Sequence, residues 1–190
     1  MIFDFDDWQQ EHDCRRELER LKEINPKFVV TLFAVPSKIT LDMSVWYENH
    51  NEWVELAVHG WTHEPNTECE NWTYEQCKEV ITKSFIKHDF VKGFKAPGWQ
   101  ISDGCYKALL EEGFWVADQH YNDDRRPKKL PVYFVGENSY HGHTWDCGCN
   151  NGIYEDWENI VKKVKEADNF KFISEIIHET NVLQKVQPKD

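Results

Sequence analysis

Hydrophobic residues follow the chain as short continuous runs separated by stretches with helical spacing. A continuous run such as 28–34 is typical of a strand that is covered on both faces. On this basis we predict strands at residues 1–5, 28–34, 54–58, 93–96, 114–117, 131–135, 138–140 and 170–176. Helices are predicted between them, at residues 14–24, 41–49, 103–112 and 154–167, with a further helix beginning after the capping residue Thr73.

The alternation of strands and helices predicts parallel β/α units joined by right-handed crossovers. About seven such strands in 190 residues indicate a small, deformed (β/α) barrel. A doubly wound open sheet is the alternative architecture. No linker, repeat or low-complexity tract interrupts the pattern, so we expect residues 1–190 to form a single domain.

Polar residues follow many of the predicted strands. In parallel β/α folds the carboxyl ends of the strands meet at one rim, where reactive groups are found. Titratable or otherwise unusual residues follow five of the predicted strands, namely Asp6 and Asp7, His59 and His63, Pro97 and Trp99 (preceded by Lys95), Asp118, and His141 with His143. This convergence predicts a functional site at the rim.

The pair His59 and His63 indicates a metal site. Two histidines four residues apart can hold one ion, although here no Glu follows the first and the pair leaves a strand rather than lying within a helix. One carboxylate from Asp6 or Asp7 would complete a three-ligand site with open positions for water and substrate. Other histidines are expected at the surface or hydrogen-bonded in the core, namely His12, His50, His88 and His120.

The charge balance excludes two classes of partner. The formal charge is −12, which argues against binding to a nucleic-acid backbone or an anionic membrane. No apolar run approaches the about 18 residues of a membrane span. The first residues are acidic from Asp4 onward, unlike a signal peptide. We therefore predict a cytoplasmic protein.

Tryptophan and cysteine add two further expectations. Several of the nine tryptophans lie beside polar residues, and they either fill the core or form flat walls of a cleft for a sugar. The six cysteines are expected to be free and buried, because a core of this size needs no disulfides in a reducing compartment. Cys147 and Cys149, close to the histidines at 141 and 143, are a minor candidate for a structural metal site.

In this order, these residues resemble the polysaccharide deacetylase family, the NodB-homology domain of carbohydrate esterase family 4. Phe5-Asp6-Asp7 matches the first motif of the family and His59-x-x-x-His63 the second. Lys95-Ala-Pro97 resembles the third motif, in which the family has Arg, and Asp118 resembles the fourth. The resemblance spans nearly the whole chain. It implies a deformed (β/α) barrel that removes N-acetyl groups from amino sugars with a divalent metal.

The resemblance also implies a role for each residue. Asp6 would be the general base, and Asp7, His59 and His63 would bind the metal, most simply Zn²⁺, with Co²⁺, Ni²⁺ or Mn²⁺ as alternatives. The general acid would be His141 or His143, and we favour His143. Lys95 would orient the base and Asp118 would act on the metal or the acid. The implied sugar-binding residues are Trp61, Pro97, Trp99 and Trp145.

Two other functions remain open. Lys95 in the position of Arg favours a non-catalytic descendant that binds carbohydrate or metal, because lysine cannot grip a carboxylate bidentately. A Cys/His zinc module that mediates interactions is the third hypothesis. For the enzyme, the expected substrate is an N-acetylated polysaccharide, an oligosaccharide or an intracellular sugar precursor.

Overall fold

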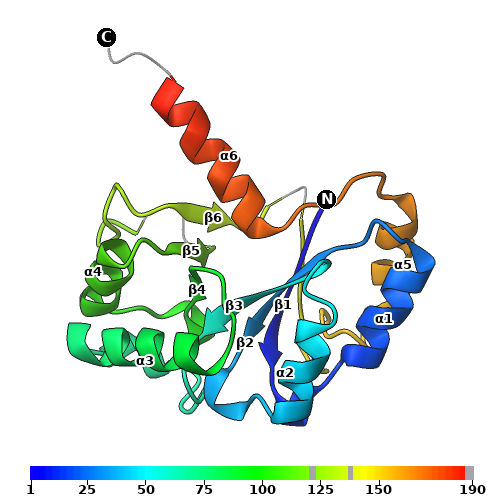
Figure 1. The fold of residues 1–190 in the computed structure, drawn as a ribbon, viewed down its shortest axis with the longest axis horizontal. Coiled ribbons are helices and arrows are strands. Elements are labelled where there is room, and N and C mark those ends of the chain that lie inside the picture. Colours follow the sequence, from blue (N-terminus) through cyan, green and yellow to red (C-terminus); the bar gives the residue numbers. More distant parts are fainter. Residues whose placement is uncertain (120–122, 137–138, 187–190) are drawn as a thin grey trace.

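The computed structural model describes residues 1–119, 123–136 and 139–186. Its sheet contains seven parallel strands in the order β6-β5-β4-β3-β2-β1-β7. The strands are β1 (Ile2–Trp8), β2 (Val30–Ala34), β3 (Val54–His59), β4 (Gly93–Lys95), β5 (Trp115–Asp118), β6 (Val132–Phe134) and β7 (Ser139–His143). The sheet curls into a half-barrel whose edge strands are β6 and β7 (Figure 1). The fold is the predicted deformed (β/α) barrel rather than a doubly wound open sheet.

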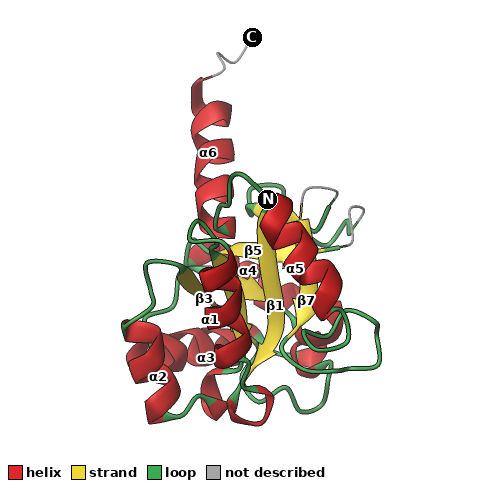
Figure 2. Ribbon diagram, turned by 90° about the vertical axis from the view of Figure 1, so that its right-hand side faces the viewer, coloured by secondary structure: helices red, strands yellow, loops and turns green. Residues whose placement is uncertain are grey.

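Helices cover the convex face of this sheet. They are α1 (Arg15–Ile24), α2 (Leu41–Glu48), α3 (Tyr74–Lys87), α4 (Asp103–Glu111) and α5 (Trp157–Glu166). Figure 2 shows α1 and α5 packed together outside β1 and β7. The predicted cap of α3 is confirmed as a capping box, since Thr73 Oγ1 accepts from the Gln76 amide at 3.2 Å and Gln76 Oε1 accepts from the Thr73 amide at 2.7 Å. In the part of the chain that the structure describes, no helix is long and apolar enough to cross a membrane.

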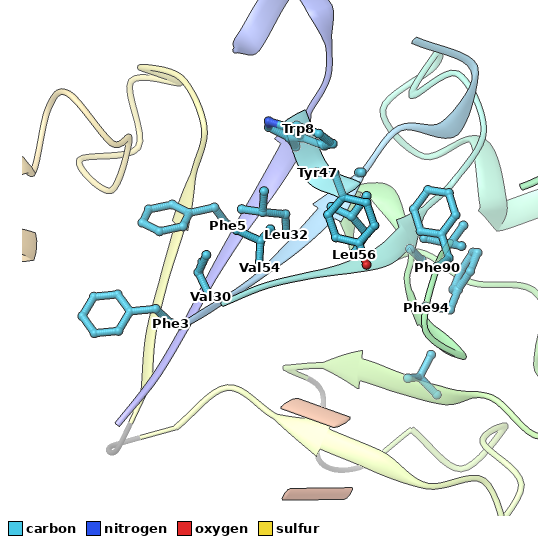
Figure 3. Close-up of a cluster of buried hydrophobic side chains, with 14 of the residues drawn as sticks. Phe3, Phe5, Trp8, Val30, Leu32, Tyr47, Val54, Leu56, Phe90 and Phe94 are labelled. Carbon is cyan, nitrogen blue, oxygen red and sulfur yellow. The ribbon is translucent and has the colours of Figure 1, made fainter. Parts of the chain in front are cut away.

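The main hydrophobic core lies between the helices and the convex face. Because successive side chains of a strand point to opposite faces, Phe3 and Phe5 of β1 point into this core. Figure 3 shows them in one layer with side chains from β2, β3 and β4. The alternate residues of β1, Asp4 and Asp6, therefore face the concave side. Burial of the aromatic layer fixes the register that brings these carboxylates together.

The concave face is closed at its amino-terminal end by α6 (Ile173–Val186). Ile173 and Ile177 pack against Phe33, Ala57 and other side chains of the concave face. Thr31 Oγ1 accepts a hydrogen bond from the Ile173 amide at 3.2 Å. The prediction of a strand at 170–176 was wrong: the apolar residues 173 and 177 are four apart, and this spacing places them on one side of a helix. Beyond this contact α6 points away from the barrel (Figure 1).

Candidate metal centre and catalytic cleft

Two adjacent carboxylates emerge on the same side of β1. In a regular strand Asp6 and Asp7 would point to opposite faces, but the pairing of β1 with β2 shifts between Phe5 and Trp8. Asp7 has a positive φ of 67°, a conformation that a residue with a side chain rarely adopts. This irregularity turns both carboxylates into the same cavity. Such local strain is typical of functional sites.

The turn after β3 presents two histidines to this cavity. His59 ends the strand, and His63 has a φ of 59° in the following turn. The carboxylate of Glu68 holds the turn, because its Oε1 accepts hydrogen bonds from the amides of Trp61 at 2.8 Å and His63 at 2.8 Å. Gly60 has a φ of +63°, and a side chain there would collide with Glu68. The turn is therefore fixed before any ligand binds.

Asp7, His59 and His63 form a cluster that we call the ligand cluster. Asp7 Oδ1 lies 3.3 Å from His59 Nε2 and 3.0 Å from His63 Nε2. His59 Nδ1 lies 2.9 Å from the carbonyl oxygen of Lys95, which can only accept a hydrogen bond. A His59 that bound an ion would therefore keep its proton on Nδ1 and offer the lone pair of Nε2 to the ion. One oxygen and two imidazole nitrogens converging in this way suit a divalent cation such as Zn²⁺.

The electrostatics of the ligand cluster agree with this. Burial alone would raise the pKa of Asp7, but the imidazoles of His59 and His63 outweigh burial and hold this pKa well below its usual range. Burial alone would lower the pKa of His63, and the Asp7 carboxylate reverses that effect and raises the pKa above 6.5. Asp7 is thus ionised at neutral pH, and its carboxylate stabilises the protonated form of His63.

A second group of charges lies directly beside the first, and we call it the lysine cluster: Asp4, Asp6, Lys95 and His141. Lys95 Nζ lies 2.8 Å from Asp6 Oδ1 and 3.5 Å from Asp4 Oδ1. His141 Nδ1 lies 2.7 Å from Asp4 Oδ1. The lysine is fully buried, and its ammonium lies 4.1 Å from the ring centre of Trp99. The predicted contact between Lys95 and Asp6 is therefore present.

The lysine keeps Asp6 ionised. Burial would raise the pKa of the Asp6 carboxyl, but the positive charge of Lys95, with smaller contributions from His141 and His59, lowers this pKa below its ordinary value. The two clusters together contain three carboxylates and one ammonium, so their formal charge is −2 while the histidines are neutral. A divalent cation would neutralise this charge.

The cavity above the two clusters has a volume of about 660 Å³. Trp99 and Trp145, both predicted to bind sugar, form part of its lining, as does His143. Trp145 Nε1 donates a hydrogen bond to Asp7 Oδ2 at 2.8 Å, and its ring stacks on His12 with the centres 4.5 Å apart. His141 lies deeper, beside Lys95, and is absent from the lining. Both histidines lie within β7 rather than after it.

Three predicted site residues lie elsewhere. Asp118 pairs with Arg126, and neither residue lines the cavity. Trp61 lies under Lys83 and Lys87, whose ammonium groups are 5.8 Å and 5.6 Å from the centre of its ring. Pro97 is buried, and its neighbours in sequence line the cavity in its place. Their roles in binding or catalysis stay predictions.

Two residues of the site, Asp4 and Glu68, are not among those predicted from the sequence. Asp4 is fully buried between Lys95 and His141, and the alternation of Phe and Asp in Phe3-Asp4-Phe5-Asp6 was the signal that it faces the same side as Asp6. Glu68 gave no such signal. It reaches back to the turn from a short 3₁₀ helix, Glu68–Asn71, and only the tertiary structure places it there.

Comparison by sequence finds no relative: no known family model and no curated protein matches. Solved structures do match. A family 4 acetyl xylan esterase from Clostridium thermocellum, solved with a cobalt ion, has a TM-score of 0.63 and 13% identity, over 95% of this chain and 91% of that chain. The peptidoglycan deacetylase PdaC from Bacillus subtilis has a TM-score of 0.59 and 15% identity, over 97% and 94%. This chain has the carbohydrate esterase family 4 fold.

The family 4 fold does not by itself imply activity. A third similar structure, BA3943 from Bacillus anthracis, is described as a family pseudoenzyme; it has a TM-score of 0.52 and 16% identity, over 93% of this chain and 64% of that chain. Whether a chain with the family 4 fold is a catalyst must therefore be argued from its own side chains.

Proposed function

We propose that this protein is a metal-dependent hydrolase that removes acetyl groups from N-acetylated amino sugars. The observation that carries the proposal is the convergence of Asp7 Oδ1 with the Nε2 atoms of His59 and His63, beside a second carboxylate, Asp6, that is kept ionised. A divalent ion bound there, most simply Zn²⁺, would polarise an amide carbonyl and make a water molecule more acidic.

The residues of the chain then have distinct tasks. Asp6 accepts a proton from the water that adds to the amide carbon, and Lys95 holds the carboxylate in position. His143 donates a proton to the amine as the C–N bond breaks. We assign this role to His143 rather than His141 because His143 lines the cavity, while His141 is engaged by Asp4 and Lys95. Asn151 Oδ1, 3.1 Å from His143 Nδ1, orients the ring.

The cavity supports a sugar as substrate. Trp99 and Trp145 offer aromatic surfaces beside polar side chains, which is the usual composition of a carbohydrate site. An N-acetylated polymer, an oligosaccharide or a sugar precursor all present the same acetamido group. A cytoplasmic location, which would favour the precursor, stays a prediction.

The decisive experiment separates the base from the metal ligands. We expect Asp6→Asn to lose about 10²- to 10⁴-fold of the activity while it still binds metal, because it removes the proton acceptor but no ligand. His59→Ala should lose both metal and activity. Acetate release from N-acetylated chito-oligosaccharides measures the first quantity and metal content after dialysis the second. An active Asp6→Asn protein would refute the assignment of the base.

A non-catalytic sugar-binding or metal-binding protein is the second candidate. The observation that favours it is the buried lysine in the place of the family's arginine, which allows only a single contact with Asp6. In that case the metal-loaded protein would release no acetate from any sugar tested but would still bind N-acetylated oligosaccharides in calorimetry.

A further inference from the structure

The loop after β7 carries two cysteines that the proposed hydrolase does not use, and they lie beside His143 at the end of that strand. His143 Nδ1, Cys147 Sγ and Cys149 Sγ all lie within 4.8 Å of one another. The two sulfurs form a disulfide, and both cysteines line the cavity. The expectation of six free, buried cysteines therefore holds for only four, which are Cys14, Cys69, Cys77 and Cys105. Cys149 is exposed and can be reached by reductants and by ions.

From this arrangement we infer that the reduced form of the loop is a second metal site, in which His143, Cys147 and Cys149 bind a soft or borderline ion such as Zn²⁺ or Co²⁺. Reduction by a thiol reductant opens the disulfide: two reductant thiols become a disulfide, and the protein gains two thiols. Binding of the ion then releases two protons from these thiols. The inference concerns a different ligand set from the proposed catalytic site and stands without it.

The separations between ligand atoms fit such a site. In a tetrahedral zinc site with bonds of about 2.3 Å to sulfur and 2.0–2.1 Å to nitrogen, the sulfur and nitrogen atoms lie about 3.6 Å apart. Cys147 Sγ lies 3.5 Å from His143 Nδ1. Asn151 Oδ1 lies 3.6 Å from Cys147 Sγ and 3.1 Å from His143 Nδ1, so an oxygen is at hand for the fourth position.

The backbone of the loop is fixed without the disulfide. The His143 amide donates to the Asn151 carbonyl at 3.1 Å, and the His143 carbonyl accepts from the Ile153 amide at 2.9 Å. The Glu155 carboxylate accepts from the Gly148 amide at 3.1 Å. Gly148 has a φ of +73°, which lets the chain turn sharply between the two cysteines. The ligands are thus held in position by the loop itself, as a preorganised metal site requires.

The ligands also differ from those of the first cluster in chemical type. Thiolate sulfur favours zinc and softer ions, while Asp7 supplies a hard oxygen. A cation could not occupy Asp6, His141 and His143 in the same way, because the Lys95 ammonium already lies between Asp6 and His141. If the protein is the proposed hydrolase, an ion bound to His143 Nδ1 would also prevent His143 from donating its proton to the amine. No other part of this inference depends on the proposed function.

Cobalt spectroscopy distinguishes this site from the first one. Reduced protein, titrated with Co²⁺ without oxygen, should develop a near-ultraviolet sulfur-to-cobalt charge-transfer band, which an oxygen and nitrogen site cannot produce. The band should be absent from the oxidised protein and from Cys147→Ser and Cys149→Ser, and strongly reduced in His143→Ala. It should persist in His59→Ala, which lacks a ligand of the first cluster, and in the matched thiol control Cys14→Ala.

Three results would overturn the inference. They are a reduced wild-type protein without the band, a band that survives the combined Cys147→Ser and Cys149→Ser substitutions, and a band of full intensity in His143→Ala. Zinc stoichiometry provides a second measurement that needs no activity. The reduced wild-type protein should bind one more equivalent of zinc than the double serine variant, and equal stoichiometries would contradict the site.

Discussion

The two neighbouring charge clusters at the mouth of the barrel are balanced in opposite ways. The lysine cluster contains its own cation, since Lys95 lies within 3.5 Å of both Asp4 and Asp6. The ligand cluster contains one carboxylate and two imidazoles, and no described lysine or arginine pairs with Asp7. With neutral histidines each cluster has a formal charge of −1, but only the lysine cluster has a cation of the chain beside its carboxylates. The ligand cluster needs a proton or an external cation to offset Asp7, whereas Lys95 already offsets one of the two carboxylates of the lysine cluster.

The largest effect on stability should come from removing the internal cation. We expect Lys95→Met to lower the free energy of unfolding by about 3–5 kcal/mol, because it removes the ammonium that lies beside two buried carboxylates. Urea unfolding measures this change. Lys95→Arg keeps the charge and is the matched control, which should lose less. A Lys95→Met protein as stable as wild type would mean that the buried carboxylates do not depend on Lys95.

Removing a residue of the ligand cluster should weaken metal binding rather than the stability of the fold. We expect His63→Gln to weaken metal binding by more than about 100-fold. Loss of a residue that only hydrogen-bonds to a metal ligand typically costs about 10- to 100-fold, and His63 is itself a proposed ligand. The unfolding free energy of this variant should change less than that of Lys95→Met, because the side chain is one-fifth exposed. Calorimetric metal titration tests this, with His50→Gln as a control remote from the cavity.

Metal binding should also weaken in acid. The pKa of His63 is raised above 6.5. At a pH below this pKa, His63 carries a proton that the metal ion must displace. Asp7 stays ionised throughout, because its pKa is far below its usual range. The affinity should therefore fall by about tenfold per pH unit as the pH drops below the His63 pKa. A flat profile through this range would contradict one displaced proton.

The smallest effect concerns Glu55, at the closed end of the barrel. Burial raises its pKa above 4.5, more than its hydrogen bonds to Ser174 and Thr31 lower it. The fold thus favours the protonated form, and this stability is present below pH 4.5 and is lost as the pH rises through the raised pKa. Relative to Glu55→Gln, wild type should lose stability over that window in thermal unfolding. Parallel profiles would contradict the burial argument.

The parts of the molecule that the sequence predicted are those governed by short-range patterns. Apolar runs located the strands, and the rule that parallel strands end at one rim brought together Asp6, Asp7, His59, His63 and Lys95, which come from three separate strands and one turn. The spacing of residues 173 and 177 was a helical signal that a short apolar run concealed.

The remainder depended on the folded path of the chain. Trp61 follows a site strand, yet it packs under lysines of α3, and position in the sequence does not decide which way a turn residue points. Asp4 meets Lys95 and His141 only through the register of the folded sheet. Glu68 is close in sequence to the histidine turn, but the path of the chain between them decides that its carboxylate reaches the amides of that turn. Local patterns locate strand ends, and only packing decides which side chains meet there.

The helix that fills the amino-terminal end of the half-barrel limits how a polymer can be bound. Ile173 and Ile177 pack against the concave face and close the amino-terminal end of the half-barrel. A glycan chain therefore has no passage along the barrel axis. A glycan bound as we propose would lie across the mouth and present one acetamido group to the two clusters at a time. In that arrangement, units in the middle of a long chain would be as accessible as those at its ends.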